Sequence, residues 1–86
     1  MAQDKKLIKN IWLNLSTDQG LAADVEIVVQ NTGSSHVRVQ TSILEPIATD
    51  FGIIIKPLDS VKASPTDGEF VWVLSLNEDG FVQPQF

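Results

Sequence analysis

The chain has 86 residues, no cysteine and a net charge of −5 from 11 acidic and 6 basic side chains. This length predicts one domain, and the lack of cysteine excludes disulfides and cysteine-ligated zinc. An acidic chain without a basic stripe is a poor nucleic-acid binder, and no apolar run approaches the ~20 residues of a membrane span. The N-terminus "MAQDKK" lacks the apolar region of a signal peptide, so synthesis in the cytoplasm is expected.

Runs rich in Val, Ile, Phe and Trp alternate with turn segments rich in Gly, Pro, Asn and Asp, and no helical period is sustained. This pattern predicts seven short strands, at residues 7–15, 24–30, 36–42, 52–55, 59–63, 69–75 and 80–83. Their spacing predicts a small antiparallel β-sandwich or a jelly-roll-like barrel. We expect residues 1–6 to form a flexible N-terminal arm and residues 7–86 to form the single domain.

The stretch "VVQNTGSSHVRVQ" at 28–40 holds the only histidine of the chain. Two alternating strands flank a five-residue turn, which predicts a hairpin in which Gly33 takes the strained backbone conformation. His36 then points outward from the end of the second strand. A catalytic histidine needs an orienting carboxylate, and none is implied nearby. We therefore expect His36 to be an exposed strand residue and not a catalytic base.

Two further turns carry acidic residues. In "SPTDG", Pro65 presets its own φ and Gly68 takes a positive φ. In "NEDG", Asp79 and Gly80 predict a hairpin turn. The second segment resembles a calcium loop only loosely, because it lacks the spaced oxygen ligands of an EF-hand. No catalytic, cofactor-binding or metal-binding residue is predicted, and no cofactor is expected.

The runs "GIII" and "FVWVL" are apolar on both faces, which a chain this small has difficulty covering by itself. Another subunit is one source of cover, and a central strand covered by loops is the alternative. The first interpretation predicts an oligomer or coat interface made of apolar side chains, namely Trp12, Ile53, Ile54, Ile55, Phe70 and Trp72.

The order of three segments resembles a group of small phage virion proteins of the head decoration or head-fibre type. The segments are "IVVQNTGSSHVRVQTS", "DFGIIIKPLDSV" and "DGEFVWVLSLNEDGFVQ", within residues 25–83. The N-terminal 20 residues carry little of the pattern. The resemblance implies a non-enzymatic β-sandwich that binds the outside of a capsid or tail, commonly as a homotrimer, and it carries over no catalytic residue.

The expected function is therefore capsid decoration, with the chain itself and a major coat or other virion protein as partners and the virion as its location. Lys5, Lys6 and Lys9 are expected to form an arm that orders on an acidic coat surface, and a frayed terminus is the alternative. A second hypothesis is a tail, collar or fibre module that contacts a host glycan through Trp12 or Phe51.

Overall fold

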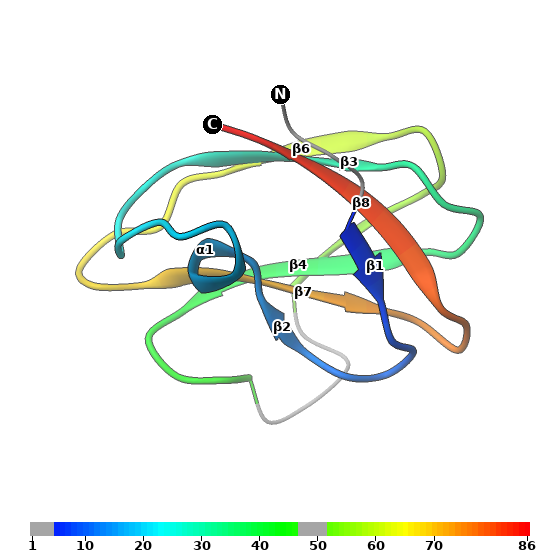
Figure 1. Cartoon of the computed structure of the whole chain (residues 1–86), viewed down its shortest axis with the longest axis horizontal. Coiled ribbons are helices and arrows are strands. Elements are labelled where there is room, and N and C mark those ends of the chain that lie inside the picture. Colours follow the sequence, from blue (N-terminus) through cyan, green and yellow to red (C-terminus); the bar gives the residue numbers. More distant parts are fainter. Residues whose placement is uncertain (1–4, 47–51) are drawn as a thin grey trace.

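The computed structural model describes residues 5–46 and 52–86, which form two antiparallel four-stranded sheets packed face to face (Figure 1). The predicted all-β sandwich is confirmed. The elements are β1 (Lys5–Leu7), β2 (Leu13–Asn14), α1 (Leu15–Asp18), β3 (Ile27–Asn31), β4 (Val37–Ser42), β5 (Ile53–Ile55), β6 (Ser60–Ala63), β7 (Phe70–Ser75) and β8 (Gly80–Gln85).

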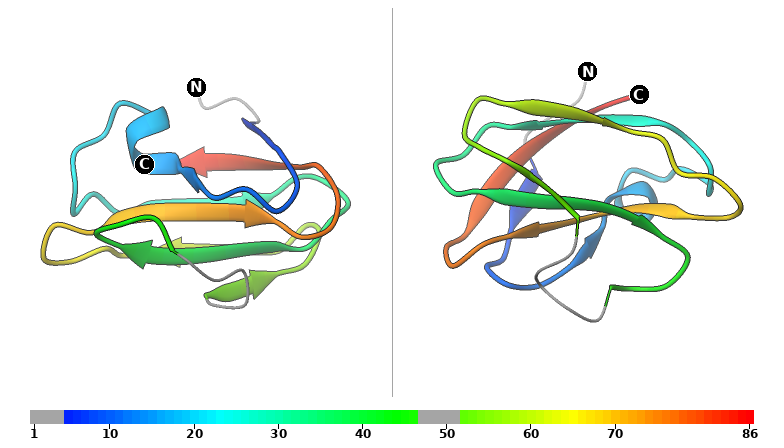
Figure 2. Two further views of the ribbon diagram at one scale, coloured as in Figure 1. Left: turned by 90° about the horizontal axis from the view of Figure 1, so that it is seen from below. Right: turned by 180° about the vertical axis from the view of Figure 1, so that it is seen from behind.

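The strand order defines a jelly roll. Sheet A has the order β1-β8-β3-β6, and sheet B has the order β2-β7-β4-β5. Each strand of the first half pairs with its counterpart in the second half: β1 with β8, β2 with β7, β3 with β6 and β4 with β5. This is the pairing of a long folded ribbon that has been rolled into two layers. Figure 2 shows the two layers from further directions.

The core lies between the sheets and is built by alternating side chains. In β3, Ile27 and Val29 are fully buried, and in β4, Val37 and Val39 are buried against them. His36 is exposed, as the alternation predicts. Burial of each such aliphatic side chain contributes about 1.5–3 kcal/mol, which makes this double layer the main source of stability.

The predicted hairpin over residues 28–40 is wrong, because β3 belongs to sheet A and β4 to sheet B. The turn carries the chain from one layer to the other. Gly33 is also not in a left-handed conformation. A Cβ at Gly33 would lie 2.8 Å from the backbone nitrogen of Phe81, so the glycine permits a close approach of two backbones. The predicted "NEDG" hairpin is wrong for the same topological reason, since β7 and β8 lie in different sheets.

The predicted strand over residues 7–15 is divided into β1, β2 and α1. Asn10 has a φ of 58° and Ile11 N–H donates to the carbonyl of Ile8, so the chain turns between the two sheets. Asn14 then caps α1, because its side chain accepts a hydrogen bond from Thr17 N–H at 3.0 Å. Lys5 and Lys6, which were predicted to belong to the N-terminal arm, are part of β1, and residues 1–4 of the predicted arm lie outside the described residues.

Asn31, at the end of β3, joins the two sheets through its side chain and is fully buried. Its amide donates to the carbonyl of Ser35 at 2.7 Å and to that of Ile55 at 3.1 Å, both on the sheet B side. Its side-chain oxygen accepts from Gly33 N–H at 3.1 Å. A buried amide with these three bonds fixes both the crossover turn and the end of β5.

We expect Asn31→Ala to lower the free energy of unfolding by about 2–4 kcal/mol, because it leaves buried carbonyl groups without donors. The measurement is equilibrium unfolding in urea. Ser34→Ala is the matched control, since Ser34 is exposed in the same turn and is expected to change stability by less than about 0.5 kcal/mol. Equal effects of the two substitutions would contradict this role of Asn31.

Candidate interaction site

The outer face of sheet B carries a row of large side chains, which we call the interaction face. Direct pairing places Arg38 beside Ile54 and Gln40 beside Trp72, and Ser42 beside Phe70. Paired residues point to the same side of a sheet, so these side chains share one surface. It combines aromatic residues, an aliphatic residue and an arginine, which are enriched in protein interfaces.

Two polar groups on the interaction face have unmet hydrogen-bonding capacity. Arg38 Nε and Gln40 Oε1 are both buried and have no hydrogen-bond partner among the described residues. Buried polar atoms are normally paired, because an unpaired one costs about 1–3 kcal/mol. The sequence places both residues outward by alternation, but it gives no sign that their polar atoms are shielded from solvent.

A groove opens beside the interaction face, at the side of the sandwich where β5 and β6 form the sheet edges. We call it the edge groove. It has a volume of about 300 Å³. Val39 and Ile53 of sheet B and Val61 and Ala63 of sheet A line it, together with Gly52 and polar neighbours. The groove therefore has apolar walls from both layers.

The six side chains predicted as an interface fall into two groups. Ile53 and Ile54 are 58 % and 46 % exposed, and Phe70 and Trp72 are half-buried, so these four are accessible to a partner. Ile55 and Trp12 are buried. Ile55 faces the core because it pairs directly with Val37. Trp12 and Ile55 therefore offer little surface to a partner.

The three lysines predicted as an arm contact their own chain. Lys5 Nζ lies 2.9 Å from Asp18 Oδ1, and Lys6 Nζ lies 3.9 Å from Asp79 Oδ2. Lys9 donates through its backbone N–H to Asp79 Oδ1 at 3.0 Å. Surface ion pairs of this kind contribute little free energy, but they hold the β1 segment against β8 and α1.

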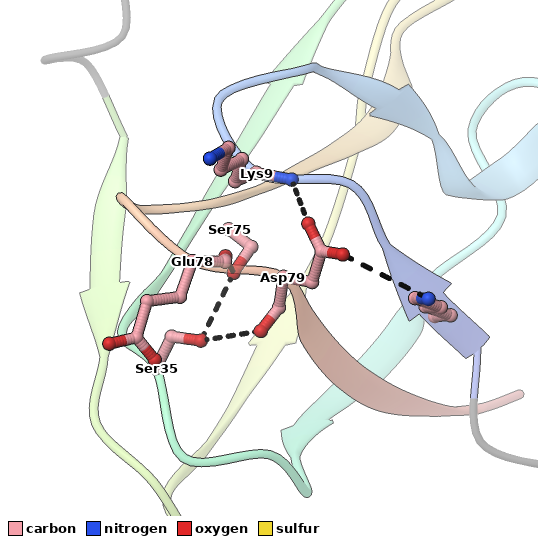
Figure 3. Close-up of polar contacts among 6 residues, drawn as sticks. Lys9, Ser35, Ser75, Glu78 and Asp79 are labelled. Atoms are coloured by element: carbon pink, nitrogen blue, oxygen red, sulfur yellow. Dashed lines mark hydrogen bonds and ion pairs between the residues drawn. The ribbon is translucent and has the colours of Figure 1, made fainter.

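Polar groups of the β3–β4 loop, the β7–β8 loop and the end of β7 meet at one end of the sandwich (Figure 3). The hydroxyl of Ser75 donates to the carbonyl of Glu78, and it lies 3.3 Å from the hydroxyl of Ser35. Ser35 in turn donates to the carbonyl of Asp79 at 3.0 Å. Each serine is used to hold backbone, so this cluster fixes the loops and leaves no activated nucleophile.

Other features bear on chemistry. His36 is exposed, and its side chain makes no hydrogen bond to a described residue. Within residues 5–46 and 52–86, no three His, Asp or Glu side chains are grouped as metal ligands would be. No helix in the described part of the chain has the length and hydropathy to cross a membrane. The expected positive φ of Gly68 is confirmed at 84°.

Comparison of the chain with protein-family models, curated proteins and solved structures finds no match.

We expect Gly80→Ala to lower the free energy of unfolding by about 1–3 kcal/mol, because the serine cluster leaves no room for a methyl group. A Cβ at Gly80 would lie 2.5 Å from Ser75 Oγ. Urea unfolding of a double-mutant cycle with Ser75→Ala provides the test. The cost of Gly80→Ala is expected to shrink in the Ser75→Ala background, and a cost that stays the same would contradict the clash.

Proposed function

We propose that the chain is a non-enzymatic phage virion protein that decorates the capsid and binds it as an oligomer. The observation that carries this proposal is the partly exposed interaction face on a domain whose described polar clusters serve to hold loops. The resemblance of residues 25–83 to head decoration and head-fibre proteins supports the same function. Jelly rolls occur among viral capsid and lectin domains, which agrees by analogy only, since a fold hosts many functions.

In this proposal the mechanism is mechanical. A bound copy bridges neighbouring coat subunits through its interaction face, and the binding free energy adds to that of the assembled shell. Any partner that binds only the assembled state shifts the equilibrium toward assembly. Ile54 and Trp72 supply the apolar area of this contact.

The alternative, a tail, collar or fibre module that binds a host glycan, has less support. Trp12 is only 8 % exposed, and the indole N–H of Trp72 donates to the carbonyl of Ser42 at 3.1 Å. A sugar-stacking platform needs an open aromatic face. Phe51, the other aromatic side chain named for this function, lies outside the described residues.

We expect Ile54→Gln to weaken binding to purified particles about three- to tenfold, because Ile54 is 46 % exposed and burial of that remainder contributes about half of the ~1.5–3 kcal/mol of a whole isoleucine. The measurement is co-sedimentation of the labelled chain with particles that lack it. Phe81→Gln is the matched control, since Phe81 is 41 % exposed on the outer face of the other sheet. Loss of binding in the control alone would place the contact on sheet A and contradict the proposal.

The location of the chain in purified particles separates the two functions. The copy number of a decoration protein is expected to stand in a fixed ratio to the number of coat subunits in the capsid. Quantitative mass spectrometry against the major coat protein measures this ratio. A few copies per particle would favour a tail or collar component, and absence from the particle would contradict both functions.

A further inference from the structure

One exposed side chain stands on a backbone conformation that disfavours it. Five non-glycine residues of the described chain have a positive φ, and four of them are Asn or Asp: Asn10, Asp24, Asp67 and Asn77. Asn and Asp tolerate the left-handed region. The fifth is Leu58, with a φ of 73°. A bulky residue there is an outlier whose strain the surrounding structure must hold.

The turn around Leu58 is held firmly. Asp59 N–H donates to the carbonyl of Lys56 at 3.0 Å, with Pro57 at the second position. This is a type II arrangement, in which the third position normally belongs to Gly or Asn. Leu58 N–H also donates to the carbonyl of Asn31, and Asn31 N–H donates to that of Asp59, each at 2.9 Å. The turn is therefore built to keep its conformation with a leucine in it.

The leucine side chain gains nothing within its own chain. Leu58 is 81 % exposed, so it buries little apolar area while its backbone carries strain. A single exposed apolar residue needs no explanation, but the combination with a positive φ does. Strain of this kind clusters at active sites, ligand clamps and switch regions. These observations indicate that the side chain is buried in a complex.

We propose that Leu58 inserts into the edge groove of a second copy of the chain. The groove is lined by Val39, Ile53, Val61 and Ala63, and its volume of about 300 Å³ can receive a leucine side chain. The turn and the groove both lie along the open β5–β6 side of the sandwich, but they use different residues. Such a head-to-tail contact closes into a ring when the rotation permits, as a trimer does.

The charged residues beside the Leu58 turn and beside the edge groove are compatible with the binding of a second copy of the chain. Lys56 and Asp59 flank Leu58, are exposed and have no ion pair among the described residues. Lys62 and Glu26 lie near the groove, with Lys62 Nζ 3.5 Å from Glu26 Oε1. Each surface thus offers one positive and one negative group to the other. Opposite charges at an interface rim favour one docking register, which matters for copies that each carry −5.

This inference rests on the self-association in the proposed function and is independent of where on the particle the chain binds. The test uses two variants of the full chain. Leu58→Asn removes the side chain and keeps the left-handed backbone, and Ile53→Asp places a charge in the groove. Light scattering at micromolar concentration is expected to show an oligomer for the wild type and at least a tenfold weaker association for each variant.

A mixture of the two variants makes the test specific. Each variant keeps the half that the other has lost, so equimolar mixing is expected to give a heterodimer that cannot close into a ring. Ile11→Asp is the control, because Ile11 is also 58 % exposed but lies in the β1–β2 loop. Its association is expected to match the wild type. At a concentration low enough for both chains to be monomeric, the urea midpoint of Leu58→Asn is expected to equal or exceed that of the wild type.

Three results would overturn the inference: a monomeric wild type, undiminished association of Leu58→Asn, or two monomeric variants that do not associate on mixing. An oligomeric wild type with undiminished Leu58→Asn association would leave the proposed capsid function intact. If the wild type does not bind particles but Leu58→Asn and Ile53→Asp weaken its self-association as expected, the capsid function alone would be contradicted.

Discussion

The buried side chain of Asn31 is the constraint on which the rest of this structure depends. Its amide spans the two sheets, and its backbone groups hold the turn that carries Leu58. An apolar residue at this position would leave the carbonyl groups of Ser35 and Ile55 without donors in the interior. Because β3 and β4 lie in different sheets, no backbone hydrogen bonds between strands join the two layers at this end. The side-chain hydrogen bonds of Asn31 join them instead.

The same arrangement explains why the candidate site lies along the β5–β6 side. β5 has three residues, and among the described strands it pairs only with β4, while β6 pairs only with β3. Neither strand is long enough to cover the space between the layers, so the edge groove remains open. A domain of this size buries a modest share of its surface, and association is one of the few supports open to it without cysteine. In the proposed association, the β5–β6 edge, the edge groove and the interaction face form one contact region.

The sequence predicted what depends on local chemistry and misplaced what depends on topology. The alternation that buries Val37 and Val39 and exposes His36 is local, and so is the positive φ of Gly68. Strand pairing is not local. A five-residue turn between two strands can join them as a hairpin within one sheet, or it can carry the chain across to the other sheet. Only the fold shows that the turn after Asn31 joins two layers.

The candidate site was predicted in part for the same reason. Apolar runs identified β5 and β7, and of the predicted interface residues Ile53 and Ile54 are exposed. The register of β5 against β4 decided that Ile55 faces the core, and no sequence pattern encodes that register. Leu58 drew no prediction, because a lone leucine in a turn gives no signal until its φ is known.

Amide hydrogen exchange of the wild-type chain at two concentrations tests the central claim most directly, namely that copies meet along the β5–β6 side. At the concentration that favours the oligomer, residues 53–64 are expected to exchange more slowly than in dilute solution. Residues 5–14, at the opposite edge of both sheets, are expected to exchange alike at both. Exchange in residues 53–64 that does not depend on concentration, or added protection only in residues 5–14, would contradict the account.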